Sequence, residues 1–130
     1  MPKHSNSLEK DKRAVAVFIE LKETTESLEK KMNQKGWGQR NALITHVNSN
    51  FNNHEELVEK RDKWEETVLQ FNVHNILLKL VAEYRDLFGY FPEYKEMMTE
   101  FQELINAAVA KEEFEIAIIL KKWKDKFPTP

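Results

Sequence analysis

Residues 53–88 contain neither glycine nor proline, and this uninterrupted stretch is the strongest constraint on how the chain can fold. Apolar residues recur in it at spacings of three and four, which is the pattern of an α-helix with an apolar face. Asn53 and Glu56 have the spacing of a helix-capping box, and Gly89 is a natural stop. The sequence therefore predicts one helix over residues 53–88, about 50 Å long.

This predicted helix carries apolar residues on two sides. One stripe contains Leu57, Trp64, Val68 and Phe71. The other begins midway and contains Leu69, Val73, Ile76, Leu80, Tyr84 and Leu87. Because a helix that is apolar on two sides needs neighbours on both, we expect residues 68–88 at the centre of a bundle. We expect full burial of Leu69, Val73, Ile76 and Leu80.

Helical spacing continues on both sides of this segment. A first helix is predicted from a capping box at Asn6 to a stop at Gly36 and Gly38, and a short second helix over residues 39–49. The first has an apolar seam at Ala14, Val17, Leu21, Thr24 and Leu28. We interpret this seam as a bundle face rather than an autonomous coiled coil, because Thr24 interrupts it.

A fourth helix is predicted to begin at Pro92, and its apolar face runs from Tyr94 to Ala108. Continuing that face would turn Lys111 and Glu112 inward, so a turn into a fifth helix is expected near residues 110–113. One long terminal helix is the alternative. The chain contains only three glycines and four prolines, which favours helices over sheet. The prediction is an all-α bundle of four or five helices in a single domain over residues 1–130, with residues 1–6 and 128–130 flexible.

The last segment resembles a known motif family. The residues that carry the resemblance are Phe101, Ala108, Glu112, Glu113, Phe114, Glu115, Ala117, Leu120, Lys121, Trp123 and Phe127. Residues 99–127 resemble the UVR motif of UvrB and UvrC, although Lys121-Lys122 and Ile105 stand where that family usually has Arg-Asp and Met. The resemblance implies a helical hairpin over residues 92–127 that makes protein contacts, which in that family join repair subunits or regulate protein quality control.

Residues 116–120 are all apolar, so a helix here presents apolar surface in nearly every direction. One neighbouring hairpin arm cannot cover that surface, so either the rest of the bundle or a partner must cover it. We favour partial exposure, with docking of a partner protein or a second copy. The predicted partner-binding residues are Phe114, Ile116, Ile119, Trp123 and Phe127. Four lysines near Trp123 are candidate phosphate contacts, namely Lys121, Lys122, Lys124 and Lys126, although complementing the helix dipole is the simpler role.

The sequence contains no recognisable arrangement of residues for catalysis or for holding a cofactor. Cysteine is absent, and no histidine is paired at helical spacing with a second metal ligand; the four are His4, His46, His54 and His74. The glutamates at 93, 96, 100 and 103 are expected to form a solvated face. His74 is expected to be solvated, and Asn75 to be a satisfied structural residue rather than part of a ligand site. No metal, cofactor or catalytic residue is predicted.

Charge and hydropathy make some functional classes less favoured for this chain. The net charge is −2, and residues 41–110 carry 6 basic and 12 acidic side chains, which disfavours a general nucleic-acid groove. No apolar run is long enough for a membrane span, and a cytoplasmic location is expected. We therefore expect a noncatalytic interaction or regulatory adaptor protein. The alternative is a nucleic-acid-associated accessory factor of phage or bacterial replication or repair, and a helical enzyme ranks third.

Overall fold

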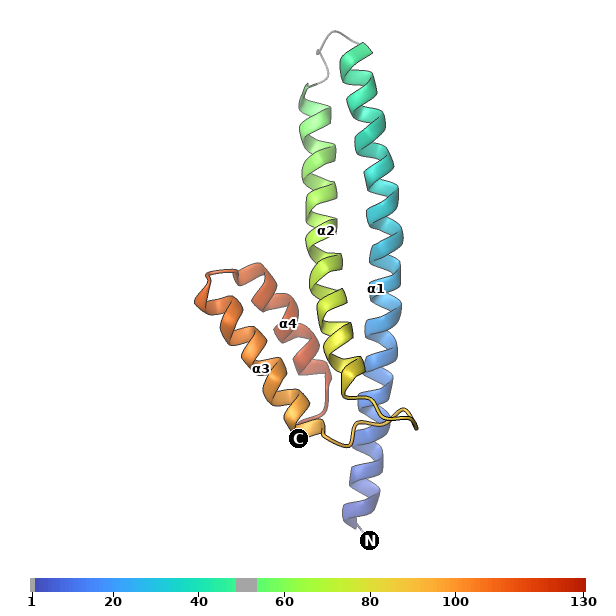
Figure 1. Cartoon of the computed structure of the whole chain (residues 1–130), viewed down its shortest axis with the longest axis vertical. Helices are drawn as coiled ribbons and strands as arrows, with labels where there is room; N and C mark the ends of the chain where they lie inside the picture. The colour runs from blue at the N-terminus through green and yellow to red at the C-terminus, as the bar shows by residue number, and fades with distance from the viewer. Residues whose placement is uncertain (1, 49–53) are drawn as a thin grey trace. The chain divides into compact units, whose positions relative to one another are not determined.

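The computed structural model describes the backbone of residues 2–48 and 54–130, and the regular structure of these residues is entirely helical. Side-chain environments are described for residues 9–36, 40, 41, 43, 44, 55 and 57–130. The helices are α1 (Pro2–Asn48), α2 (His54–Glu83), α3 (Tyr94–Ala110) and α4 (Phe114–Lys126). Helices α1 and α2 form one antiparallel hairpin, and α3 and α4 form another (Figure 1). The predicted all-α class is confirmed for the described residues.

By its internal contacts, the chain divides into two compact units. Unit 1 consists of residues 1–23 and 75–130, and unit 2 consists of residues 24–74. Unit 1 therefore contains the first part of α1, the last part of α2, and both C-terminal helices. Unit 2 is a two-helix hairpin made from the remaining parts of α1 and α2.

Helix α1 is longer than predicted at both ends. It begins at Pro2, so Asn6 lies inside it, and it continues through Gly36 to Asn48, so the short helix predicted at 39–49 is its last part. A side chain at Gly36 would place its Cβ 3.1 Å from Nε1 of Trp64. Glycine costs about 1 kcal/mol in a helix relative to alanine, but here its missing side chain makes room for an indole ring. The cap predicted at Asn53 lies outside the described residues.

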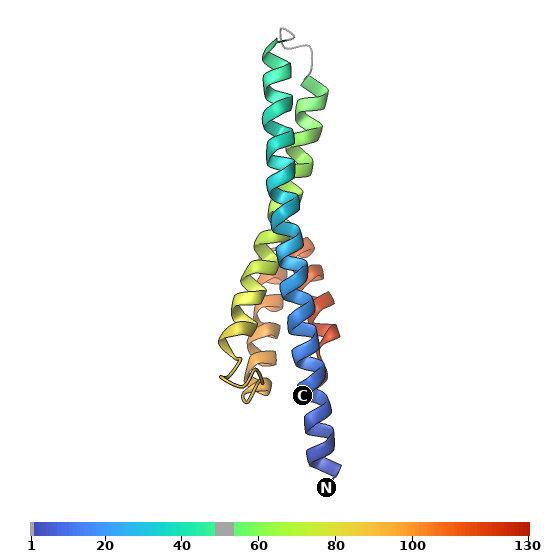
Figure 2. The same cartoon turned by 90° about the vertical axis from the view of Figure 1, so that its right-hand side faces the viewer.

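Unit 1 contains the main apolar core. Its buried apolar residues are Ala14, Val17, Phe18, Leu21, Leu77, Leu80, Val81, Phe91, Met97, Met98, Phe101, Ile105, Ala108, Ala117, Ile119, Leu120, Trp123 and Phe127. The ring of Phe18 meets that of Phe91 edge to face, with centroids 6.1 Å apart, and Phe101 meets Phe127 in the same way at 6.1 Å. Figure 2 shows α4 beside the first part of α1, where Nζ of Lys126 lies 2.5 Å from Oε1 of Glu20.

The inward face of α2 is partly different from the one predicted. Val73 and Leu80 are buried as expected, but Leu69 is half-buried and Ile76 is exposed, while Leu77 is fully buried. The helix also ends at Glu83, before the predicted Phe88. The wrong burial of Ile76 and the wrong end of the helix have one cause. The prediction treated residues 68–88 as a single helix with neighbours on two sides along its whole length.

A turn held by Asp86 replaces the last predicted turn of α2. One carboxylate oxygen of Asp86 accepts hydrogen bonds from the backbone N–H groups of Phe88 and Tyr90, both at 2.9 Å. The backbone N–H of Asp86 donates to the carbonyl oxygen of Tyr90 at 2.8 Å. Gly89 has a φ of 85°, a conformation that glycine adopts without strain. Aspartate and glycine therefore end this helix together.

The predicted turn between the last two helices is confirmed, and a single terminal helix is excluded. Lys111, Glu112 and Glu113 connect α3 to α4. The N–H of Glu113 donates to the carbonyl of Ala108 at 2.8 Å, and that of Glu112 donates to the carbonyl of Val109 at 3.0 Å. This pair of bonds is a Schellman motif, whose left-handed position is usually glycine. Here Glu112 occupies it, with a φ of 59°.

We expect Glu112→Gly to raise the free energy of unfolding by about 0.5–1 kcal/mol, because glycine adopts this backbone conformation without a steric penalty. Chemical denaturation followed by circular dichroism measures the change. Glu112→Ala is the matched control, since it removes the carboxylate but keeps the Cβ, and it should bring no such gain. Equal stabilisation by both variants would show that the charge of Glu112, and not its backbone conformation, is unfavourable.

The described residues at the two ends of the chain include helical and buried positions. Residues 2–6 belong to α1, and Pro128 is buried. The hydroxyl of Tyr94 donates a hydrogen bond to the carbonyl oxygen of Pro128, which ties the end of the chain to the start of α3. Burial raises the pKa of Tyr94, and the charge of Arg13 opposes this shift. The bond to Pro128 therefore persists well above neutral pH.

Candidate functional site

Helix α4 has a buried side and a side that faces solvent. Its buried residues are Ala117, Ile119, Leu120 and Trp123. On the opposite side lie Phe114 and Ile118, which are one turn apart and leave 57% and 69% of their surface exposed. Val109, at the end of α3, is 48% exposed. We call Val109, Phe114 and Ile118 the apolar tip, because all three lie at the turn end of the hairpin.

Charged side chains border the apolar tip. Lys111, Glu112, Glu113 and Glu115 are all exposed in or next to the turn, and Lys121 and Lys122 are exposed farther along α4. Protein interfaces commonly combine an apolar centre with a polar, solvated rim. The surface at this end of the hairpin combines exposed apolar side chains with charged ones.

The predicted partner-binding residues are divided between the interior and the surface. Phe114 is exposed and Ile116 is half-buried, but Ile119, Trp123 and Phe127 are buried inside unit 1. The expectation that the last three are exposed was wrong, because the rest of unit 1 covers that side of α4. The apolar run at 116–120 did imply that one member faces solvent. The exposed member is Ile118, which the prediction did not select.

Two of the four candidate phosphate contacts are held within the protein. Nζ of Lys124 donates a hydrogen bond to the side-chain oxygen of Gln102. Nζ of Lys126 contacts Glu20 and lies 4.6 Å from the centroid of the Trp123 ring. Lys121 and Lys122 remain exposed. Fewer lysines of α4 are therefore accessible to a phosphate than the sequence of the helix indicates.

A second exposed apolar pair lies in the loop after α2. Leu87 and Phe88 are exposed at the turn held by Asp86, whereas the sequence pattern had assigned Leu87 to an apolar stripe of the predicted helix. Phe91 does close the core, as it is buried against Phe18. The guanidinium of Arg85 lies 4.9 Å from the centroid of the Phe18 ring. Tight local hydrogen bonding thus forces two large apolar side chains outward.

His74 and Tyr84 are polar side chains of the described residues that have hydrogen-bond partners within the protein. His74 was expected to be solvated but is buried, and its Nδ1 lies 2.6 Å from the carbonyl oxygen of Gln70. Asn75 is half-buried. The hydroxyl of Tyr84 donates to Oε2 of Glu100 at 2.5 Å, and this bond raises the pKa of Tyr84 to about 12. Among the described residues, no three potential ligands are grouped to hold a metal ion, while His4, His46 and His54 lie outside the described side chains.

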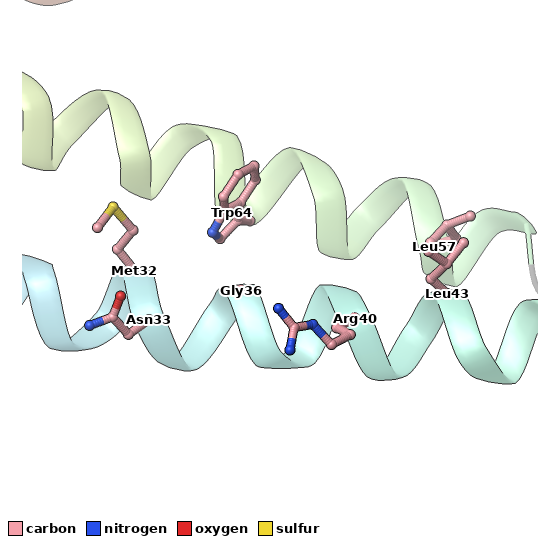
Figure 3. Close-up of a pocket in the computed structure, with 7 residues that line it drawn as sticks. All are labelled: Met32, Asn33, Gly36, Arg40, Leu43, Leu57 and Trp64. Carbon is pink, nitrogen blue, oxygen red and sulfur yellow. The ribbon is translucent and has the colours of Figure 1, made fainter.

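Unit 2 contains a groove of about 720 Å³ between its two helices. It is lined by Met32, Asn33, Gly36, Arg40, Leu43, Leu57 and Trp64. The ring of Trp64 extends from α2 toward Gly36 on α1, and Leu57 and Leu43 face each other farther along (Figure 3). Nζ of Lys35 on α1 donates to the hydroxyl of Thr67 on α2 at 2.9 Å. A hydrogen bond therefore joins the two helices of unit 2, which leave a groove between them that both apolar and polar side chains line.

No family model, curated protein or solved structure matches this chain. The structure does show the helix pair that the resemblance to the UVR motif implies, without showing membership of that family. In the part of the chain that the structure describes, no helix is long and apolar enough to cross a membrane.

Proposed function

We propose that this chain is a noncatalytic helical interaction protein that docks on a partner protein through the apolar tip of its α3–α4 hairpin. The observation that carries the proposal is the exposure of Phe114 and Ile118 on the side of α4 that faces away from a complete core. Single exposed apolar residues are common, but exposed apolar residues that gather at one place on a protein are characteristic of interaction sites. Three such residues lie at this end of the hairpin.

Two further observations support this proposal. The backbone of the turn is fixed by the Schellman hydrogen bonds, so little conformational entropy is lost when a partner orders it. The ring of Phe114 is large and has few rotamers, and aromatic residues of this kind are frequent anchors of protein interfaces. The apolar tip therefore offers a preformed surface with a central anchor.

The proposal is tested by affinity capture from an extract of the native cell, with bound proteins quantified by mass spectrometry. The test variant is Phe114→Asp with Ile118→Asp, which places two charges on the apolar tip without disturbing buried residues. The control variant is Thr99→Asp with Asn106→Asp, which adds the same charges at exposed positions on α3. We expect the wild type and the control to retain one partner that the test variant loses by at least about tenfold.

Circular dichroism must show the same helix content for all three proteins. Equal retention of every protein by the test variant and the wild type would contradict docking through the apolar tip. The nucleic-acid alternative predicts a different result, namely binding to nucleic acid that falls steeply with salt and is lost in Lys121→Asp with Lys122→Asp. We rank it lower because Lys124 and Lys126 make contacts within the protein.

A further inference from the structure

The hairpin of unit 2 buries little apolar surface. Among its described side chains, the buried ones are Thr25, Thr67, Val73 and His74, of which three are polar. Its larger apolar residues remain partly accessible, and Leu43 and Ile44 leave 50% and 53% of their surface exposed. Two helices side by side cannot enclose a core, because each can cover only one side of the other. Unit 2 therefore carries apolar side chains that a four-helix bundle would bury, but it contains only two helices.

The groove in unit 2 is the place where apolar side chains of the two helices lack packing neighbours. Met32 and Leu43 from α1 and Leu57 and Trp64 from α2 line its apolar part. Protein interiors are close-packed, and side chains that border open space lose dispersion contacts that a neighbour would supply. A groove of this size accommodates several apolar side chains from another helical surface.

The charges of the hairpin differ between its two helices. In residues 24–48 four basic side chains outnumber two acidic ones, and in residues 54–74 six acidic side chains outnumber three basic ones. The α1 part of unit 2 is thus net positive and the α2 part net negative. Two copies related by a twofold axis can place each α1 against the α2 of the other copy, so opposite charges meet twice.

We propose that unit 2 pairs with unit 2 of a second copy of this chain to form a four-helix bundle, in which α1 of each copy lies against α2 of the other. Four helices enclose a continuous apolar core, which two helices cannot do. In this bundle, apolar side chains of one copy fill the groove of the other. The pairing uses a surface separate from the apolar tip, so it is independent of the proposed partner docking.

The first experiment is sedimentation velocity of the full chain over a wide range of concentrations. The wild type is expected to be a dimer in equilibrium with monomer. Leu43→Lys should raise the dissociation constant of the dimer by at least about tenfold, because a half-exposed apolar residue that lines the groove is replaced by a charge. Phe114→Asp with Ile118→Asp should leave the dimer unchanged. A wild type that stays monomeric would overturn the proposal and leave the groove to a different protein.

The second experiment uses charge reversal to test the arrangement of the helices. One variant carries Lys30→Glu and Lys31→Glu on α1, and the other carries Glu65→Lys and Glu66→Lys on α2; all four positions are exposed. Each variant alone is expected to be monomeric, because like charges oppose each other across the dimer. An equimolar mixture should form a heterodimer, in which both pairs of helices again carry opposite charges.

Effects of the substitutions within one copy cannot produce this rescue, since mixing changes only contacts between copies. Circular dichroism checks that each variant keeps its helix content. Two variants that remain monomeric when mixed would rule out the pairing of α1 with α2. A wild-type dimer that none of these variants weakens, or that is lost on changing the apolar tip, would overturn the proposed interface.

Discussion

Phe101→Ala is expected to lower the free energy of unfolding by about 3–5 kcal/mol, which is among the largest losses expected from a single substitution in unit 1. Phe101 is 0% exposed, and its ring packs edge to face on that of Phe127. Removing it leaves a cavity between α3 and the end of the chain. Chemical denaturation followed by circular dichroism measures the change.

Phe114→Ala is the matched control, because it removes the same atoms from the surface of the neighbouring helix. The loss should stay within about 0.5 kcal/mol. Similar losses for Phe101→Ala and Phe114→Ala would show that the inward and outward sides of the hairpin are wrongly assigned.

Trp123→Ala is expected to cost a similar amount, about 3–5 kcal/mol, since the indole is 3% exposed. It also removes the ring over which the ammonium group of Lys126 lies. Thermal and chemical unfolding of the variant measure the loss. Ile118→Ala serves as the control, because Ile118 lies on the same helix but faces solvent.

This substitution separates two interpretations of Trp123. If Trp123 belongs to the core, the variant has a lower free energy of unfolding, and no loss of one particular partner is expected. If the variant instead keeps the stability of the wild type and loses a partner, the original prediction of Trp123 as a docking residue is right and its burial in unit 1 does not describe the protein in solution.

Helical periodicity predicted the existence and type of the long elements well. The turn at 111–113 was predicted although neither glycine nor proline marks it, because the apolar face of α3 could not continue past Ala108. Partial exposure of the run 116–120 was also predicted, but Ile119 was named as an exposed residue, whereas Ile118 is the residue that faces solvent. Both predictions used only the repeat of the helix, which is a local property of the sequence.

Other features could not be predicted because they depend on contacts distant in the chain. Gly36 appeared to end a helix, since nothing in the sequence around it shows that Trp64 packs over that position. Ile119, Trp123 and Phe127 form an apolar face, but the sequence does not say whether this chain or another one covers it. The end of α2 depended on the side-chain hydrogen bonds of Asp86, which break a pattern that otherwise continues.

The division of unit 1 into two chain segments sets an order of folding during synthesis. Lys126, which pairs with Glu20, lies 106 residues farther along the chain. At the usual speed of translation, this separation takes roughly 5–20 s to synthesise. The hairpin of residues 24–74 is complete in the nascent chain long before that, and helices form within microseconds. The side chain of Phe18 therefore leaves the ribosome well before Phe91, on whose ring it packs.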